Sequence, residues 1–150
     1  MIEVRDDNVV ISRERLTPDA VYGLLLLLDP SFAKSLSEEV DIKPYSVKLA
    51  VHANFEVATV SGHWGGVIAF YENEKELYIP YVCVSVANRR IGVADLLLDS
   101  LCRYADSLGK SVSLEVLTTN VAAIRLYEKH GFRIVKNGET KFYMTRVCRP

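Results

Sequence analysis

The chain has 150 residues, of which 49% are hydrophobic and 25% are charged. This composition excludes a disordered chain and predicts a single globular domain over residues 1–150, with enough apolar mass for a core. Its net charge of −1 argues against a general nucleic-acid binder, which would carry a basic excess.

Cysteine and histidine usage argues against disulfides and metals. The three cysteines are an odd number without Cys-x-x-Cys spacing, and the three histidines show no ligand spacing. No signal peptide is recognisable, and the longest purely apolar run, residues 24–28, is too short to span a bilayer. We therefore expect a reduced, cytoplasmic protein that uses no metal and no membrane.

The N-terminal third predicts two helices. In residues 17–29, Thr17 can cap a helix and Pro18 suits its first position. Residues 35–53 give a second helical stretch, with Pro44 near its start. The first 11 residues can add a strand.

After these helices the apolar period changes to two, which is typical of strands. Residues 54–60 and 65–71 flank a Gly-rich segment and predict a β-hairpin, with His63 and Trp64 on its turn. Residues 77–86 predict another strand, apolar on both faces and therefore central in its sheet. Within it, proline at position 80 indicates a bulge or an edge.

The second half alternates helices and strands. It predicts a helix over residues 92–108, a strand over 111–117, a helix over 120–131, and a strand–turn–strand unit over 132–147. Helices interleaved with both hairpins and crossovers predict an α/β fold of the α+β kind, in which helices pack on a mixed sheet.

The segment VANRRIGVA, residues 86–94, passes from strand to helix. A helix N-terminus presents unpaired N–H groups and the positive end of the helix dipole, so it attracts anions. Gly92 and Ala94 lack bulk, and Arg89 and Arg90 add positive charge. On these residues alone, a phosphate site and close packing of helix on strand remain equal alternatives. The P-loop and dinucleotide-binding fingerprints are both absent.

Two motifs resemble a known family. RRIGVA matches the pattern R/Q-x-x-G-x-G/A and resembles the acetyl-coenzyme A pyrophosphate loop of the GNAT N-acetyltransferase superfamily. NVAAIRLYEKHGF, residues 120–132, is very similar to the later N-x-x-A-x-x-L-Y-x-x-x-G-F motif of that family. The chain departs from the family pattern at Val86, where proline is usual, and at Arg90, where glycine often follows the arginine. The resemblance covers roughly residues 50–147.

The resemblance implies the GNAT fold, a central mixed sheet of about six or seven strands flanked by about four helices. This sheet is splayed between the family's fourth and fifth strands, and the pantetheine arm of acetyl-coenzyme A lies in the gap. Backbone groups of Cys83, Val84 and Val86 would pair with the arm, and the N–H groups of residues 90–94 would hold the pyrophosphate. The implied cofactor-binding residues are Cys83, Val84, Val86, Arg89, Arg90, Ile91, Gly92, Val93, Ala94, Asn120 and Tyr127.

By the same resemblance, a primary amine attacks the thioester directly. Tyr127 matches the family's general acid, the alternative being an aromatic that packs on the sheet. The Val84 N–H is the candidate oxyanion donor. Tyr78 stands where many relatives have a glutamate base; with a pKa of ~10 it is a poor base and can instead hold a water. Asn120 either contacts the pantetheine or caps its helix.

Three functions are therefore compared. The first is an acetyl-coenzyme A-dependent N-acetyltransferase acting on a small-molecule amine such as an amino sugar. The second is a non-catalytic acyl-coenzyme A sensor or interaction module on the same fold. The third is an unrelated nucleotide-binding protein. A homodimer is compatible with the first two.

Overall fold

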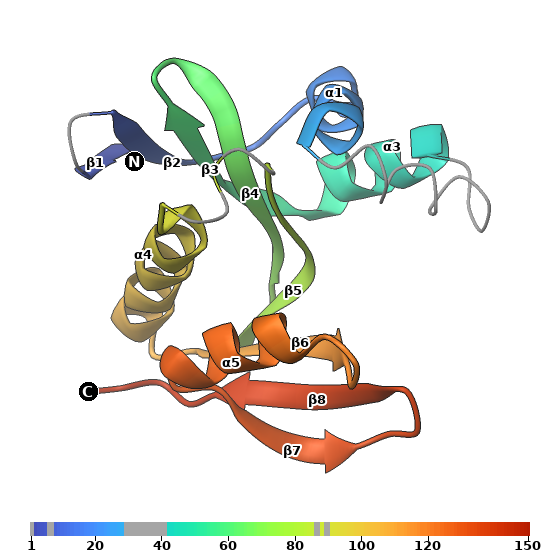
Figure 1. Cartoon of the computed structure of the whole chain (residues 1–150), viewed down its shortest axis with the longest axis vertical. Coiled ribbons are helices and arrows are strands. Elements are labelled where there is room, and N and C mark those ends of the chain that lie inside the picture. Colours follow the sequence, from blue (N-terminus) through green and yellow to red (C-terminus); the bar gives the residue numbers. More distant parts are fainter. Residues whose placement is uncertain (1, 6–7, 29–41, 86–87, 89–90) are drawn as a thin grey trace.

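The computed structural model describes residues 2–5, 8–28, 42–85, 88 and 91–150, and these form one mixed sheet with helices on both faces (Figure 1). Its eight strands run in the order β1-β2-β3-β4-β5-β6-β8-β7. The strands are β1 (Ile2–Arg5), β2 (Val9–Glu14), β3 (Asn54–Val60), β4 (His63–Glu72), β5 (Glu76–Val84), β6 (Ser111–Leu117), β7 (Arg133–Asn137) and β8 (Lys141–Arg146). Only β5 and β6 pair in parallel, so the predicted mixed sheet is confirmed. The sheet has more strands than the six or seven that were predicted, because the N-terminal residues form two strands, β1 and β2.

Four helices of the described chain pack on this sheet. They are α1 (Pro18–Leu28), α3 (Ile42–His52), α4 (Val93–Leu108) and α5 (Val121–Lys129). α1 and α3 cover one face of the β3–β5 region, and α4 covers the other (Figure 1). Each face has its own apolar core, with Leu24, Leu49 and Phe55 on the first and Ile68 and Leu97 on the second. Within the described ranges, no helix is long and apolar enough to cross a membrane.

The predicted start of α1 and the predicted end of α4 are confirmed. The Thr17 hydroxyl accepts the Ala20 N–H at 3.2 Å, which caps α1 as expected. α4 ends at Gly109, whose φ of 68° is left-handed and favours glycine. α3 begins at Ile42, and the earlier part of its predicted range, residues 35–41, lies outside the described residues.

The β3–β4 hairpin is tighter than predicted. Its turn consists of Ser61 and Gly62 alone, with φ values of 51° and 81°. Positive φ at both positions matches the twist of paired strands. His63 and Trp64 already belong to β4, so the prediction that they lie on the turn is wrong. The register shift just beyond Trp64 leaves the next glycine, Gly65, as an extra residue in β4, which makes it part of a bulge rather than of the turn.

A buried polar group fixes α4 on the sheet. Glu56 of β3 is fully buried, accepts a hydrogen bond from the Ser100 hydroxyl of α4 at 2.8 Å, and pairs with Arg13 of β2. A buried carboxylate needs such partners, because its desolvation is otherwise expensive. The network therefore sets the position of α4 relative to β2 and β3.

Strand β5 is central, as predicted, and Pro80 interrupts it on both sides. The register with β4 shifts between Ala69 and Tyr71, which lie opposite the proline. On the other side, pairing with β6 stops at the Ile79–Leu114 pair. Proline has no N–H to donate to a ladder, so an irregularity is expected at this position. The predicted bulge is confirmed.

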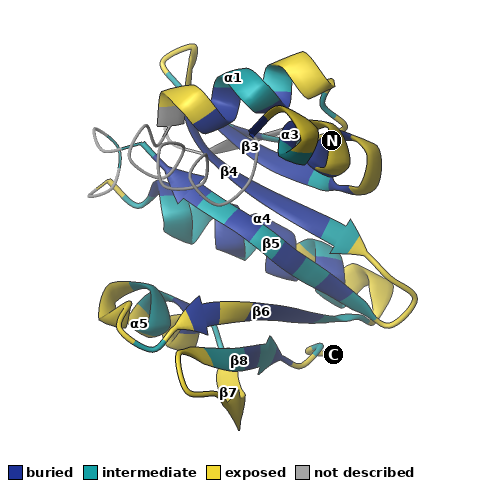
Figure 2. Cartoon of the chain, turned by 90° about the vertical axis from the view of Figure 1, so that its right-hand side faces the viewer, coloured by how far each residue is buried: buried dark blue, intermediate teal, exposed yellow. Residues whose placement is uncertain are grey.

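Beyond Pro80, β5 and β6 separate. β5 continues to Val84 and β6 continues to Leu117, but no residues of the two strands pair after Leu114. Figure 2 shows the strands converging at one end and diverging at the other, with α5 beside the open end. This is the splay that the sequence resemblance implied.

Candidate active site

Two cavities occupy the splay between β5 and β6. The larger, of about 430 Å³, lies between the end of β5, the start of α4 and α5. The smaller, of about 220 Å³, lies between residues 79–82 of β5 and residues 114–117 of β6. Val82, Asn120, Ala123 and Tyr127 line both, so the two spaces adjoin one another.

The N-terminus of α4 forms one end of the larger cavity. Gly92 is its N-cap, with a φ of 82°, and its carbonyl accepts the Leu96 N–H at 3.0 Å. A glycine has no side chain to cap the helix, so the N–H groups of Val93, Ala94 and Asp95 point out of the first turn. Three such donors at the positive end of a helix dipole are suited to a phosphate group.

The other residues predicted for this loop divide into two sets. The Val93 side chain is fully buried, so this residue can face a ligand only through its backbone. Ile91 is exposed at the end of the loop. Val86, Arg89 and Arg90 lie outside the described residues, and their roles remain predictions.

The backbone of β5 presents alternate residues to the splay. The Ser85 N–H donates to the Gly65 carbonyl of β4 at 2.9 Å. In an antiparallel ladder, every second residue points its backbone groups to the same neighbour. Cys83 therefore directs its N–H and C=O toward β4, whereas Val82 and Val84 direct theirs toward the splay. This register adds Val82, which the sequence analysis did not single out, although counting back two residues from Val84 would have found it.

Tyr127 lies between the two cavities. Its side chain comes from α5, is only 8% exposed, and packs against Phe132 with ring centroids 5.7 Å apart. Burial raises the pKa of Tyr127 to about 12, because the phenolate would lose its hydration. The hydroxyl makes no hydrogen bond with the described residues. Tyr127 is thus protonated at neutral pH and lines both cavities, and its role as a general acid stays a prediction.

Asn120 caps α5, which was one of its two predicted roles. Its Oδ1 accepts the Ala123 N–H at 3.2 Å and caps α5. The same residue lines both cavities. The cap fixes the first turn of the helix that carries Tyr127, and contact of Asn120 with a pantetheine arm stays a prediction.

Tyr78 lies at the closed end of the splay. It pairs with Ser113 of β6, and its ring stacks on Tyr71 with an interplanar angle of 8° and centroids 6.5 Å apart. Burial, and after it the charge of Glu115, raise the pKa of Tyr78 to about 12. Tyr78 is therefore protonated at neutral pH, which makes it unsuitable as a general base.

Glu115 lines the site as well, and the sequence analysis did not single it out. It lies on β6 and lines the smaller cavity together with Tyr127. Its nearest described cation is Lys141, with Nζ 3.8 Å from Oε2. The available signal was a single carboxylate within the otherwise uncharged strand SVSLEVL, at the end that borders the splay.

Asp95 connects the two helices that border the larger cavity. Its Oδ1 lies 2.9 Å from Lys129 Nζ and 2.9 Å from His130 Nε2, at the end of α5. Burial alone would raise the pKa of Asp95, but hydrogen bonds from Lys129 and His130 lower it overall. The part of the chain that is described holds no cluster of three side chains suited to a metal ion.

A mixed sheet that splays beside an uncapped helix N-terminus offers one continuous site with both backbone donors for a phosphate and a strand edge for an extended ligand. A sequence profile of the acetyltransferase (GNAT) family matches residues 26–132. The chain therefore belongs to the GNAT acetyltransferase family and is an acyltransferase.

Solved structures agree with this fold. The PaiA N-acetyltransferase from Thermoplasma acidophilum, in complex with coenzyme A, superposes with a TM-score of 0.76 at 16% identity, over 91% of this chain and 98% of that one. Ard1 from Thermoplasma volcanium superposes with a TM-score of 0.75 at 25% identity, over 93% of this chain and 99% of that one. A GNAT family acetyltransferase from Elizabethkingia anophelis with acetyl-CoA bound superposes with a TM-score of 0.68 at 19% identity, over 95% of this chain and 99% of that one.

Proposed function

We propose that this protein transfers the acetyl group of acetyl-coenzyme A to a primary amine of a small molecule, by direct attack of the amine on the thioester. One observation carries the proposal. Tyr127 is buried, protonated and without a described hydrogen-bond partner, and it lines both cavities of a splay that ends at the uncapped N-terminus of α4. Two of the similar structures contain coenzyme A or acetyl-coenzyme A, which supports this choice of co-substrate.

The residues present fit the chemistry of such a co-substrate. A diphosphate needs N–H donors and positive potential, which Val93, Ala94 and Asp95 provide through their backbones. An extended arm with two amides needs a strand edge, which β5 provides beyond its last pair with β6, where the backbone groups of Val82 and Val84 are directed toward the splay.

Two groups of the chain would act on the reacting atoms. The Tyr127 hydroxyl donates its proton to the departing thiolate, and a raised pKa keeps that proton in place until sulfur becomes basic. A backbone N–H of β5 stabilises the negative charge that develops on the carbonyl oxygen. Val84 was the predicted donor. Val82 is a second candidate, because it lines the smaller cavity as well as the larger one.

The remaining predictions belong to the same proposal. The acceptor is a small molecule, and an amino sugar is one amine of suitable size. With a net charge of −1, nothing in the composition suggests a nucleic-acid partner. A cytoplasmic location and a homodimer stay predictions.

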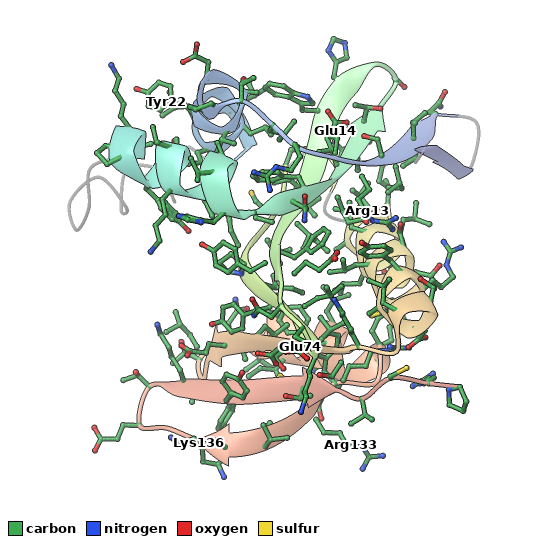
Figure 3. The ribbon with its side chains drawn as sticks, turned by 180° about the vertical axis from the view of Figure 1, so that it is seen from behind. Arg13, Glu14, Tyr22, Glu74, Arg133 and Lys136 are labelled. Carbon is green, nitrogen blue, oxygen red and sulfur yellow. The ribbon has the colours of Figure 1, made fainter. Side chains whose placement is uncertain are left out.

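A thiol-release assay with a panel of amines tests the proposal. We expect amine-dependent release of coenzyme A, and we expect Tyr127→Phe to lower turnover by roughly 10- to 1,000-fold without changing coenzyme A affinity in calorimetry. Tyr22→Phe is the matched control, because Tyr22 belongs to α1, at the other end of the molecule from β7 and β8 (Figure 3). An unchanged rate in Tyr127→Phe would remove this residue from the mechanism. Coenzyme A binding without amine-dependent release would favour the sensor module.

A further inference from the structure

A cavity of about 420 Å³ borders the β7–β8 hairpin, next to the splay. It is lined by Glu115, Lys136, Gly138, Lys141, Phe142 and Tyr143. Glu115 also lines the 220 Å³ cavity that Tyr127 borders, so the two spaces adjoin one another. The volume of the hairpin cavity lies within the usual range of small-molecule sites, about 300–1,000 Å³. A molecule that reacts beside Tyr127 can therefore extend into this second space.

Strand register arranges three of these residues in a row. Tyr143 of β8 lies opposite Glu115 of β6 on one side and opposite Lys136 of β7 on the other (Figure 3). Directly opposed residues point to the same face of a sheet. Met144, next to Tyr143, is buried in the core beneath α4 and α5, so the row occupies the opposite face. With neighbouring strands about 4.8 Å apart, the row extends roughly 10 Å from the splay to the edge of the sheet.

Two cations gather at the outer end of this row. The β7–β8 turn closes with the Gly138 N–H donating to the Lys141 carbonyl at 2.8 Å, which places Lys136 and Lys141 on the two sides of one turn. The Lys136 ammonium group is exposed and has no hydrogen-bond or ion-pair partner among the described residues. The ion pair of Lys141 with Glu115, at 3.8 Å, is exposed and therefore contributes little. Both ammonium groups are thus available to an anion that enters the cavity.

Charge gives this surface a direction. Glu115 stands at the border of the smaller cavity, whereas the two lysines line the hairpin cavity beyond it. The negative charge of Glu115 repels an anion from the space beside Tyr127, and the lysines attract it. Between these charges, the partly exposed ring of Tyr143 offers an apolar surface for the body of a ligand. An elongated molecule is therefore held with its anionic end toward β7.

Building on the proposed acetyltransferase activity, we propose that the acceptor carries an anionic group roughly 10 Å from its amine, and that Lys136 and Lys141 bind this group. The body of the acceptor then lies on Tyr143, and its amine lies in the smaller cavity beside Tyr127. Lysine ammonium groups bind carboxylates and phosphates alike, as point charges. The chemistry that the site recognises is therefore an anion at a fixed distance from a primary amine.

Steady-state acetylation of matched amines tests this proposal. The anionic acceptors are 8-aminooctanoate and 6-aminohexyl phosphate, and 8-aminooctanamide is their neutral match. At low salt we expect the wild-type enzyme to prefer both anions by about tenfold or more in kcat/KM, chiefly through KM. About 0.5 M salt should reduce this preference, because the lysines are exposed to solvent. The better of the two anions identifies the group that the acceptor carries.

Replacing the lysines should remove the preference. Lys136→Ala and Lys141→Ala should each raise KM for the anionic amines by about three- to fivefold, and the double variant should treat anionic and neutral amines alike. The kcat values and all parameters for 8-aminooctanamide should not change. Lys75→Ala is the matched control, because it removes the same charge from the exposed turn between β4 and β5, and it should leave every parameter unchanged.

A short pair of amines tests the distance. β-Alanine places its carboxylate too close to its amine to reach the lysines, so it should be no better an acceptor than β-alaninamide. An equal gain for β-alanine would overturn the spacing. Equal kcat/KM for the long anionic and neutral amines in the wild-type enzyme, or a preference that survives in the double variant, would overturn the lysine site.

A binding measurement separates this proposal from the proposed function. A wild-type enzyme that binds coenzyme A but acetylates no amine would overturn the proposed function. The lysine site is then tested by calorimetry of 6-aminohexyl phosphate with the coenzyme A complex, where the affinity should fall about tenfold in the double variant. Equal affinity of the two proteins would overturn the site.

Discussion

Replacing Gly92 with alanine tests the phosphate-binding role of the α4 N-terminus. A Cβ at this position would meet no atom within 4 Å, so the substitution creates no clash. The cost comes from the φ of 82°, which an L-residue adopts at a penalty of roughly 1–2 kcal/mol. The backbone can relieve that strain by rotating, and rotation moves the N–H groups of Val93 and Ala94.

The same helix offers a matched control. Gly109 ends α4 with a φ of 68°, and a Cβ there would also meet no atom within 4 Å. Gly109→Ala should therefore lower the free energy of unfolding by the same roughly 1–2 kcal/mol, equivalent to a few degrees in Tm. Only Gly92→Ala should also weaken coenzyme A binding, by about tenfold, since 1.4 kcal/mol corresponds to one order of magnitude in affinity.

Urea unfolding and calorimetry with coenzyme A measure the two quantities separately. Equal losses of stability with a loss of affinity in Gly92→Ala alone would support the phosphate site. Coenzyme A affinity that is unchanged in Gly92→Ala, despite lowered stability, would refute the reasoning and leave the glycine a purely structural role.

Two further predictions concern the ion pairs around α4 and α5. Asp106→Asn should destabilise the protein by about 2 kcal/mol, because it removes the bidentate partner of the buried Arg146, now held at 2.8 and 3.0 Å. The hydrogen bonds from Arg146 lower the pKa of Asp106 more than burial raises it. The stabilisation is therefore present above pH ~4 and is lost as the pH falls through the lowered pKa. Urea unfolding of both proteins as a function of pH measures this, and a pH-independent difference would contradict it. Asp95→Asn removes a negative charge beside the N–H donors of α4 and releases Lys129 from its ion pair. Coenzyme A binding should therefore tighten by up to about fivefold at low salt, and by less at about 0.5 M salt. Weaker binding would show that the pairing of α4 with α5 matters more than the charge.

The sequence was informative wherever a local conformation needs a particular residue. Gly92 and Gly109 have left-handed φ values, and Asn120 caps α5, so these positions were visible without long-range information. Pro80 marked the interruption of β5 for the same reason, because a missing N–H is a local property.

Features that depend on strand register could not be predicted from the sequence. The turn after β3 contains two residues and excludes His63 and Trp64, because these two residues pair with β3 and Gly65 forms a bulge. The direction of the β5 backbone depends on the Ser85–Gly65 hydrogen bond, which joins residues twenty positions apart and places Val82, rather than Cys83, toward the splay. Glu115 lies near Tyr127 only because β6 is parallel to β5 and diverges from it.

The position of Pro80 explains why an open strand edge persists inside the sheet. Backbone N–H and C=O groups that are buried without partners cost about 1–3 kcal/mol each, so a sheet normally closes such a gap. Here the proline removes one donor and coincides with the bulge against β4, so continued pairing with β6 would be incomplete. The strands separate instead, and the backbone groups of Val82 face a cavity that water or an amide-bearing ligand can enter. A ligand that restores the missing ladder bonds therefore gains from polar groups that are already in place. In this fold, the residue that cannot donate a hydrogen bond stands where the centre of the sheet becomes an open strand edge.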